Sequence, residues 1–325
     1  TDHIDAVKAF TQADIDHVIY VETPPLPDEP PRTSPSPWVL LLHKALEGIK
    51  QGAYLWFAHN KAAWLKLGFT SWLNEPNLYL HAALGIRVGV FADDILAGYP
   101  AERTNDYLSI KRAYSALINI GSTDLSPVLK FTGVQISRDR RERTLTISQP
   151  RYIEQLAEEY KDKFALQDTP YGADKAARDR FDALLPPTDG GTIDRVTYLK
   201  LMGKLVWPSH MTRVDVAMAV SKLCTFANGA TQLHYDYALG VVGYLVSTKN
   251  VGITFGGRLR VPLGLHSHPP HFFESSGLYC VHDSSWGTHP RPMGGYVVMF
   301  CNAAIDWGSN RVKIVPASSH EAEAA

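Results

Sequence analysis

The chain has 325 residues, of which 45% are hydrophobic and 20% charged, and its formal net charge is -1. This length predicts about two domains, each large enough to bury its own core. The composition excludes a disordered chain, a collagen and a coiled coil, and the near-zero charge argues against a small basic nucleic-acid-binding domain. Any polyanionic partner must therefore be bound by local patches of positive charge.

The cysteines and the apolar stretches indicate where such a chain would reside. Three cysteines, at 224, 280 and 301, are too widely spaced for a disulfide framework or a zinc site, which predicts a reducing compartment rather than secretion. No apolar stretch reaches the roughly 18 to 20 residues of a membrane span. The sequence begins at Thr1 without a signal peptide or an initiator Met, so we expect an interior piece of a longer protein.

The order of apolar and polar residues predicts a mixture of helices and strands. Seven prolines between 23 and 37 indicate a surface loop. Apolar side chains at helical spacing predict one or two helices over 44–67 and another over 102–120. Residues 79–95 predict two strand runs, the second interrupted by a turn. Further along, we expect strands at 130–136, 144–148, 252–265, two within 277–301 and one at 303–307, and helices at 150–164, 197–226, 231–248 and from 318 onward.

Two stretches indicate boundaries rather than elements. Periodicity fades over 172–189, where a linker is expected, and 266–273 is a loop rich in proline and histidine. The histidines of that loop, His266, His268 and His271, are zinc-ligand types, but the sequence offers no fourth ligand nearby, which favours an ordinary loop.

The charged segment 137–143 joins two predicted strands and contains four arginines. They could line a nucleic-acid path, but the acids interleaved among them favour a solvated hairpin tip.

The strongest local signal is the pair Asp93-Asp94 between two apolar runs. Adjacent carboxylates repel one another and lose hydration in such a setting unless a cation neutralises them. One reading is therefore a divalent metal site, since hard cations prefer carboxylate oxygens. The other is an exposed Asp-Asp turn of a hairpin, because aspartate is common in turns.

A third acid, Asp5, makes the pattern specific. Its D-x-x-x-A-F segment is followed by a G-x-K-Q segment and then by the aromatic-x-D-D segment. This order resembles the reverse transcriptase of copia-type LTR retrotransposons, and the similarity runs over nearly the whole chain. The matching blocks are 4–10 with 19–22, 44–51, 91–96, 131–136, 145–149 with 152–153, and 211–215.

The resemblance implies two-metal phosphoryl transfer. In that family three carboxylates hold two Mg²⁺ ions, which activate the primer 3′-hydroxyl and neutralise the triphosphate. The matching residues here are Asp5, Asp93 and Asp94, as catalytic residues and metal ligands. The expected activity is RNA-directed DNA polymerase, a nucleotidyltransferase of a transposable element.

Other matched positions imply contacts with the substrates. Phe10 corresponds to the residue that excludes a ribose 2′-hydroxyl, and it can equally be a buried aromatic of the core. Gln51 and Gly52 fall where the family contacts the incoming nucleotide, and 131–133 where it grips the primer terminus.

Two further blocks, 282–286 and 305–307 with 317–323, resemble the opening half of the ribonuclease H domain that follows this polymerase. They make Asp283 and Glu321 the first two acids of that nuclease, which uses the same two-metal scheme. Its remaining acids would lie after Ala325. A nuclease made of these residues alone is expected to be incomplete.

The implied fold is α/β (α+β): a reverse-transcriptase palm with partial fingers, thumb and connection, followed by a truncated ribonuclease H-like α/β domain. The expected bounds are 1–147 for palm and partial fingers, 148–190 for a thumb-like segment and linker, 191–273 for the connection region, and 274–325 for the N-terminal half of the ribonuclease H domain.

The implied partners are an RNA template, a DNA primer, RNA–DNA hybrid and deoxynucleoside triphosphates, without a membrane. Protease and integrase segments of a parent Pol polyprotein, which serve DNA integration, are expected too, in a cytoplasmic virus-like particle or in the nucleus. An alternative remains: a catalytically inactive retroelement fragment that at most binds nucleic acid, because the strands expected before Asp5 are missing. A stand-alone ribonuclease H is disfavoured, since that domain is the least complete part.

Overall fold

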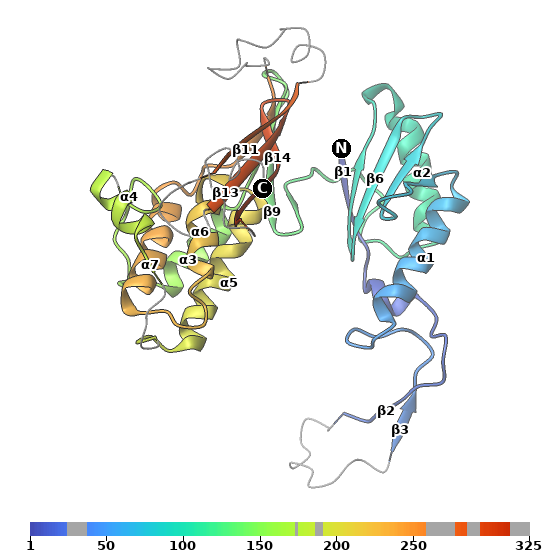
Figure 1. The fold of residues 1–325 in the computed structure, drawn as a ribbon. Helices are drawn as coiled ribbons and strands as arrows, with labels where there is room; N and C mark the ends of the chain where they lie inside the picture. Colours follow the sequence, from blue (N-terminus) through green and yellow to red (C-terminus); the bar gives the residue numbers. More distant parts are fainter. Residues whose placement is uncertain (25–37, 173–174, 186–190, 258–276, 285–292, 313–325) are drawn as a thin grey trace. The chain divides into compact units, whose positions relative to one another are not determined.

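The computed structural model describes residues 1–24, 38–172, 175–185, 191–257, 277–284 and 293–312. The chain divides into two compact units, residues 1–132 and 133–325 (Figure 1). Both combine helices with antiparallel sheets, so the expected mixed α/β class is confirmed. In the described ranges, none of the helices combines the length and the apolar character that crossing a bilayer requires.

The first unit is built on a five-stranded antiparallel sheet with the order β1-β7-β6-β5-β4. A separate hairpin pairs β2 with β3, and short 3-10 turns η1 and η2 lie beside two helices. The bounds are β1 (Asp2–Asp5), η1 (Ala9–Gln12), β2 (Tyr20–Glu22), β3 (Val39–Leu41), α1 (Gly52–Lys66), β4 (Thr70–Ser71), β5 (Leu78–His81), β6 (Ile86–Phe91), β7 (Asp94–Gly98), η2 (Ala101–Arg103) and α2 (Thr104–Ser115).

Buried and exposed side chains alternate along the strands, and the buried ones mark the face of this sheet that packs against the helices. Ile4 of β1 and Ile95 of β7 are directly paired and fully buried against side chains of α1 and α2. Among these, Trp64 of α1 stacks on Tyr114 of α2 with ring centroids 4.1 Å apart. Successive strand residues point to opposite faces, so the neighbours of Ile4 and Ile95, including Asp5, lie on the face away from the helices.

The described part of the second unit contains helices that share one hydrophobic core and two antiparallel sheets, ordered β11-β10-β9 and β12-β13-β14. β8 (Lys130–Phe131) is the last strand before the boundary between the units. The other bounds are β9 (Val134–Asp139), β10 (Thr144–Ser148), α3 (Pro150–Glu159), α4 (Lys175–Asp182), α5 (Arg195–Met211), η3 (Val214–Val216), α6 (Ala217–Cys224), α7 (Gln232–Ser247), β11 (Ile253–Gly256), β12 (Leu278–Ser284), β13 (Met293–Phe300) and β14 (Ala303–Arg311).

A buried arginine separates α5 from α6. The guanidinium of Arg213 is fully buried, donates to the Asp215 carboxylate at 2.7 Å and donates to the Thr248 hydroxyl at 2.6 Å after α7. Burial alone would raise the pKa of Asp215, but the hydrogen bonds and charge of Arg213, together with the hydrogen bond from the Tyr244 hydroxyl, lower it. The continuous helix predicted over 197–226 is therefore wrong, because the chain leaves helical geometry to bury this ion pair.

The remaining predicted elements divide into three groups. The strands predicted within 79–95 and at 144–148 and the helix at 231–248 are confirmed with small shifts of their ends, and the strand predicted at 303–307 extends to Arg311. The single strand predicted at 130–136 is instead two strands, β8 and β9, because Thr132 and Gly133 between them adopt left-handed φ values of 48° and 82°. The helix predicted at 150–164 ends at Glu159. The first helix begins only at Gly52, because Gly48 adopts a left-handed φ of 89° that interrupts a helix before it, and α2 ends at Ser115 rather than at 120. The linker expected over 172–189 contains α4, whose Phe181 is fully buried in the helical core.

Several predictions lie outside the described residues: most of the proline-rich loop, the strand residues after 257, the histidine loop, residues 285–292 between the two strands expected within 277–301, and the helix from 318.

Candidate active site

The Asp93-Asp94 pair lies at a tight hairpin between β6 and β7. Phe91 pairs with Asp94, which leaves a two-residue turn formed by Ala92 and Asp93. Ala92 adopts a left-handed φ of 52°, as two-residue hairpin turns require at one or both central positions. The turn therefore presents Asp93 at its tip and Asp94 as the first residue of the following strand.

β1 brings the third acid to the same place. Asp5 is the direct cross-strand partner of Asp94, and the backbone N–H of Ala6 donates to the carbonyl of Asp93 at 3.0 Å. Side chains of direct partners have Cβ atoms about 4.5–5.5 Å apart. The structure thus gathers Asp5, Asp93 and Asp94 at one end of the sheet, although Asp5 lies far from the pair in sequence.

The three acids form a cluster of negative charge. Asp5 and Asp93 are exposed, and in the described part of the chain no Lys or Arg forms an ion pair with any of the three. Asp94 alone has side-chain partners: His3 lies 2.9 Å from one oxygen, and the backbone N–H of Thr132 donates to the other at 3.3 Å. Like charges facing each other across strands are destabilising, so a bound cation would relieve this arrangement.

The donor chemistry fits a hard divalent cation, since carboxylate oxygens are the ligands such ions prefer. Across the described ranges, however, no three His, Cys, Asp or Glu side chains already form a group that could hold a metal ion. The support for a metal therefore comes from the type and convergence of the acids, and not from a preformed cage.

The strand that carries Asp5 is anchored at its other end by a buried carboxylate. Asp2 is completely buried and accepts hydrogen bonds from the Tyr107 hydroxyl at 2.5 Å, the Lys111 ammonium at 2.7 Å and the Ser126 backbone N–H at 2.5 Å. Burial and then the Asp2 carboxylate raise the pKa of Tyr107, so the phenol remains a donor. This network fixes the position of β1 relative to α2.

Helix α1 touches the acidic turn from the helix-covered face. The Trp56 indole N–H donates to the Ala92 carbonyl at 2.8 Å, and the Trp56 side chain is 3% exposed. This contact could not be predicted from the sequence, because nothing in the spacing of Trp56 distinguishes it from the other core residues of the helix.

Gln51 and Gly52 lie at the N-terminus of this same helix. A Cβ on Gly52 would come 2.8 Å from the carbonyl oxygen of Leu46, which explains a glycine there on structural grounds. Phe10 lies in η1 just after β1, is partly buried against the core of the first unit, and η1 lies against α1. The nucleotide contacts of these three residues stay predictions.

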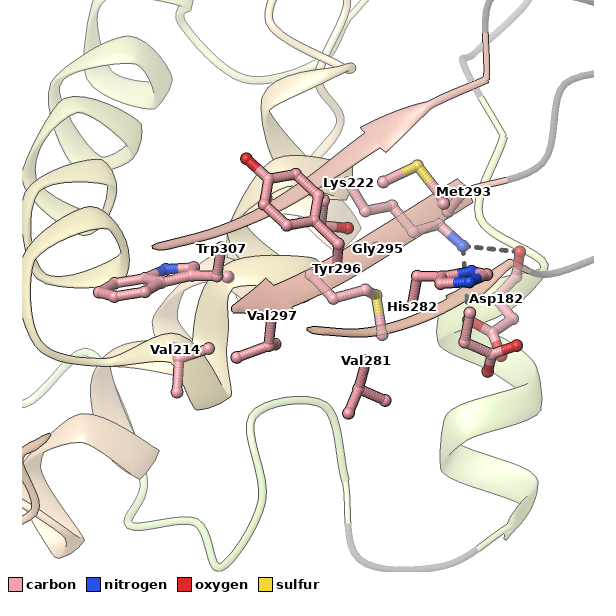
Figure 2. Close-up of a pocket in the computed structure, with 16 residues that line it drawn as sticks. Asp182, Val214, Lys222, Val281, His282, Met293, Gly295, Tyr296, Val297 and Trp307 are labelled. Carbon is pink, nitrogen blue, oxygen red and sulfur yellow. Dashed lines mark hydrogen bonds and ion pairs between the residues drawn. The ribbon is translucent and has the colours of Figure 1, made fainter. Parts of the chain in front are cut away.

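Asp283 lies in the second unit, where it is exposed on β12 and pairs with Gly295 of β13. It lines a cavity of about 430 Å³ between α6 and the sheet β12-β13-β14. Figure 2 shows this cavity, with Lys222 of α6 hydrogen-bonded to Asp182 and Trp307 at the opposite end. Glu321 lies outside the described residues, so the structure does not bear on the second nuclease acid.

Comparison with known proteins decides the family. A sequence profile described as "Reverse transcriptase (RNA-dependent DNA polymerase)" matches residues 1–169, which include all three clustered acids. The chain belongs to the reverse transcriptase family. This match confirms the resemblance to reverse transcriptases that the sequence motifs indicated. The transposon relatives described next confirm that the resemblance is to the copia type.

Several relatives of this chain are transposon proteins. It is 27% identical over 326 residues to the putative transposon Ty5-1 protein of Saccharomyces cerevisiae, covering 98% of the chain and 96% of that protein. It is 25% identical to the retrovirus-related Pol polyproteins from transposon TNT 1-94 of Nicotiana tabacum and transposon RE2 of Arabidopsis thaliana, covering 99% and 98% of the chain. The chain spans only 23% and 20% of the length of those two polyproteins.

Proposed function

We propose that this chain carries the RNA-directed DNA polymerase activity of a copia-type retrotransposon, with Asp5, Asp93 and Asp94 as its catalytic metal ligands. The observation that supports this most strongly is the cross-strand pairing of Asp5 with Asp94 beside the Asp93 turn, without a Lys or Arg ion pair in the described residues. Membership of the reverse transcriptase family indicates which reaction these acids would catalyse, and enzymes of that family generally use divalent metal ions.

In the proposed mechanism the chain positions the carboxylates before the substrates arrive. Asp5 and Asp94 are held on neighbouring strands, and His3 together with the Thr132 N–H orients Asp94. Bound Mg²⁺ would activate the primer 3′-hydroxyl and neutralise the triphosphate charge. Such rigid positioning supplies most of the rate in phosphoryl transfer.

The wider assignments belong to the same proposal. Residues 1–147 form palm and partial fingers, 148–190 a thumb-like segment, 191–273 a connection, and 274–325 the start of a ribonuclease H domain with Asp283 and Glu321. The substrates are RNA template, DNA primer, RNA–DNA hybrid and deoxynucleoside triphosphates. The parent is a Pol polyprotein with protease and integrase segments, which acts in a virus-like particle of the cytoplasm or in the nucleus. The names of the plant relatives, which are retrovirus-related Pol polyproteins, support the polyprotein part of this proposal.

Primer extension on an RNA template tests the polymerase proposal. We expect Asp93→Asn to lower the extension rate by on the order of 100-fold or more, because it removes a metal ligand but keeps the shape of the turn. The measurement is the initial rate with Mg²⁺, compared with the unchanged chain and with a version extended at both ends.

Two control variants have the same Asp→Asn chemistry elsewhere. Asp106 lies on the surface of α2, paired with Arg103, and Asp283 lies in the second unit. Both Asn variants should extend the primer within about twofold of the unchanged chain, as surface charges contribute little. Equal rates for Asp93→Asn and the unchanged chain, or no extension even by the longer version, would favour the inactive nucleic-acid-binding fragment instead.

A further inference from the structure

The hairpin turn that carries Asp93 has a weak point at its central peptide group. A two-residue turn is closed by bonds between the flanking residues, here Phe91 and Asp94, while the peptide between Ala92 and Asp93 has no partner within the turn. Turn types differ by rotation of this central peptide. Such a rotation would change ψ of Ala92 and φ of Asp93, the two dihedral angles that set the backbone geometry from which the Asp93 side chain projects.

Helix α1 supplies the missing partner. The carbonyl of that central peptide, Ala92 C=O, accepts the Trp56 indole N–H at 2.8 Å. The next peptide is held from the other side, where the Ala6 N–H donates to the Asp93 carbonyl at 3.0 Å. The two peptide groups that flank Asp93 are therefore held by two different elements, α1 and β1.

The donor itself is rigidly placed. Trp56 is 3% exposed and belongs to the hydrophobic core of the first unit, so its ring has little freedom to turn. A left-handed Ala92 is a conformation that an L residue adopts only when surrounding contacts maintain it.

We propose that Trp56 is a positioning residue of the polymerase site: its indole N–H fixes the central peptide of the turn and thereby aims the Asp93 carboxylate. This inference rests on the proposed function for the role of Asp93. It predicts that the N–H, and not merely the bulk of the ring, matters for metal binding and for the rate of the chemical step.

The same helix contains a matched control. Trp64 is fully buried two turns further along α1, stacks on Tyr114, and has an indole N–H with no hydrogen-bond partner in the described part of the chain. Trp56→Phe and Trp64→Phe therefore remove the same atoms from one helix and one core, but only the first removes a hydrogen bond to the turn.

The experiment compares these two variants in the full chain by Mn²⁺ binding, followed by electron paramagnetic resonance, and by primer-extension kcat and KM. Because a hydrogen bond is worth about 1 kcal/mol, we expect Trp56→Phe to weaken Mn²⁺ binding and lower kcat by roughly fivefold to tenfold, with KM for primer–template unchanged. Trp64→Phe should leave both within about twofold. A further variant with benzothienylalanine at position 56, which keeps the ring shape without the N–H, should behave like Trp56→Phe even if the phenylalanine variant folds poorly.

The outcomes separate the two proposals. Mn²⁺ affinity and kcat that change equally in the Trp56 and Trp64 variants, or in neither, would overturn the positioning role even if the unchanged chain extends primers. Failure of both the unchanged chain and the version extended at both ends to extend a primer would overturn the proposed function, while the Mn²⁺ titration still decides whether the Trp56 N–H aims the acids.

Discussion

At the scale of single residues, a buried ion pair anchors β1 to α2 in addition to the pairing of β1 with β7. The Lys111 ammonium and the Asp2 carboxylate have side chains 1% and 0% exposed and lie 2.7 Å apart. Removal of one partner leaves the other charge buried without compensation. Asp2 is three residues before Asp5 on the same strand, so this pair supports one of the proposed metal ligands from a distance.

We predict that Lys111→Met lowers the free energy of unfolding by about 3–5 kcal/mol, because it strands the Asp2 carboxylate in the core. Urea unfolding followed by fluorescence measures the change. The control is Arg103→Met, which removes the exposed partner of Asp106 on the same helical segment and should cost less than about 0.5 kcal/mol. A loss below 1 kcal/mol in Lys111→Met would mean that water or rearrangement compensates the carboxylate.

The candidate site was only partly predictable at this scale. The order of motifs identified Asp5, Asp93 and Asp94, because each stands in a recognisable local pattern. The contacts of Trp56 with Ala92 and of His3 with Asp94 join residues 36 and 91 positions apart in the chain. Contacts of that kind depend on how the helix and the strands pack, which no local pattern encodes.

At the scale of elements, α7 illustrates how a helix can approach a neighbouring segment through a glycine. At Gly243 a Cβ would lie 2.0 Å from the backbone carbonyl oxygen of Ala165. Gly240, one turn earlier on the same helix, has no atom within 4 Å of its Cβ position. The two glycines therefore have different reasons for being there, although both lie within one predicted helix.

We predict opposite effects for alanine at these two positions. Gly243→Ala should destabilise the second unit by about 3 kcal/mol, because the helix must move away from a backbone atom that cannot yield. Gly240→Ala should stabilise it by about 0.5–1 kcal/mol through helix propensity. Thermal unfolding followed by circular dichroism compares them, and equal effects of the two substitutions would contradict the close approach.

Helices and strands were predicted correctly where apolar residues recur at a regular spacing. They were missed where one or two buried side chains decide the structure. The patterns around α7 and the hairpin β9-β10 identified both correctly. Helix α4 was mistaken for a linker, because among its eight residues Phe181 is the one that is fully buried. The break between α5 and α6 was missed because apolar residues recur at helical spacing on both sides of it, while the buried contacts of Arg213 between them depend on packing.

At the scale of the whole molecule, each unit has its own hydrophobic core. One core contains residues of β1, β5, β6, β7, α1 and α2, and another joins α3, α4, α5, α6 and α7. A unit with its own core can unfold as a separate cooperative transition. The length prior of about two domains agrees with this division, although the sequence motifs suggested boundaries elsewhere.

We predict two resolvable transitions in differential scanning calorimetry. Because Lys111 belongs to the first unit and Gly243 to the second, Lys111→Met should shift one transition and Gly243→Ala the other. Each shift should amount to several degrees for the affected transition and be negligible for its neighbour. A single transition that both variants lower together would show that the units unfold as one cooperative body.

The two-residue turn at Ala92-Asp93 has a consequence for how copies of this sequence can change. β7 is paired with β6 on one edge and with β1 on the other. An inserted codon that shifted β7 by one residue against β6 and β1 would exchange its faces and move Ile95 and Ala97 out of the core. Substitutions in this segment are tolerated far more readily than changes in its length. When genomic copies are compared, a reading frame that keeps Ile95 and Ala97 in register with β6 and β1 is therefore one condition for the first unit to fold.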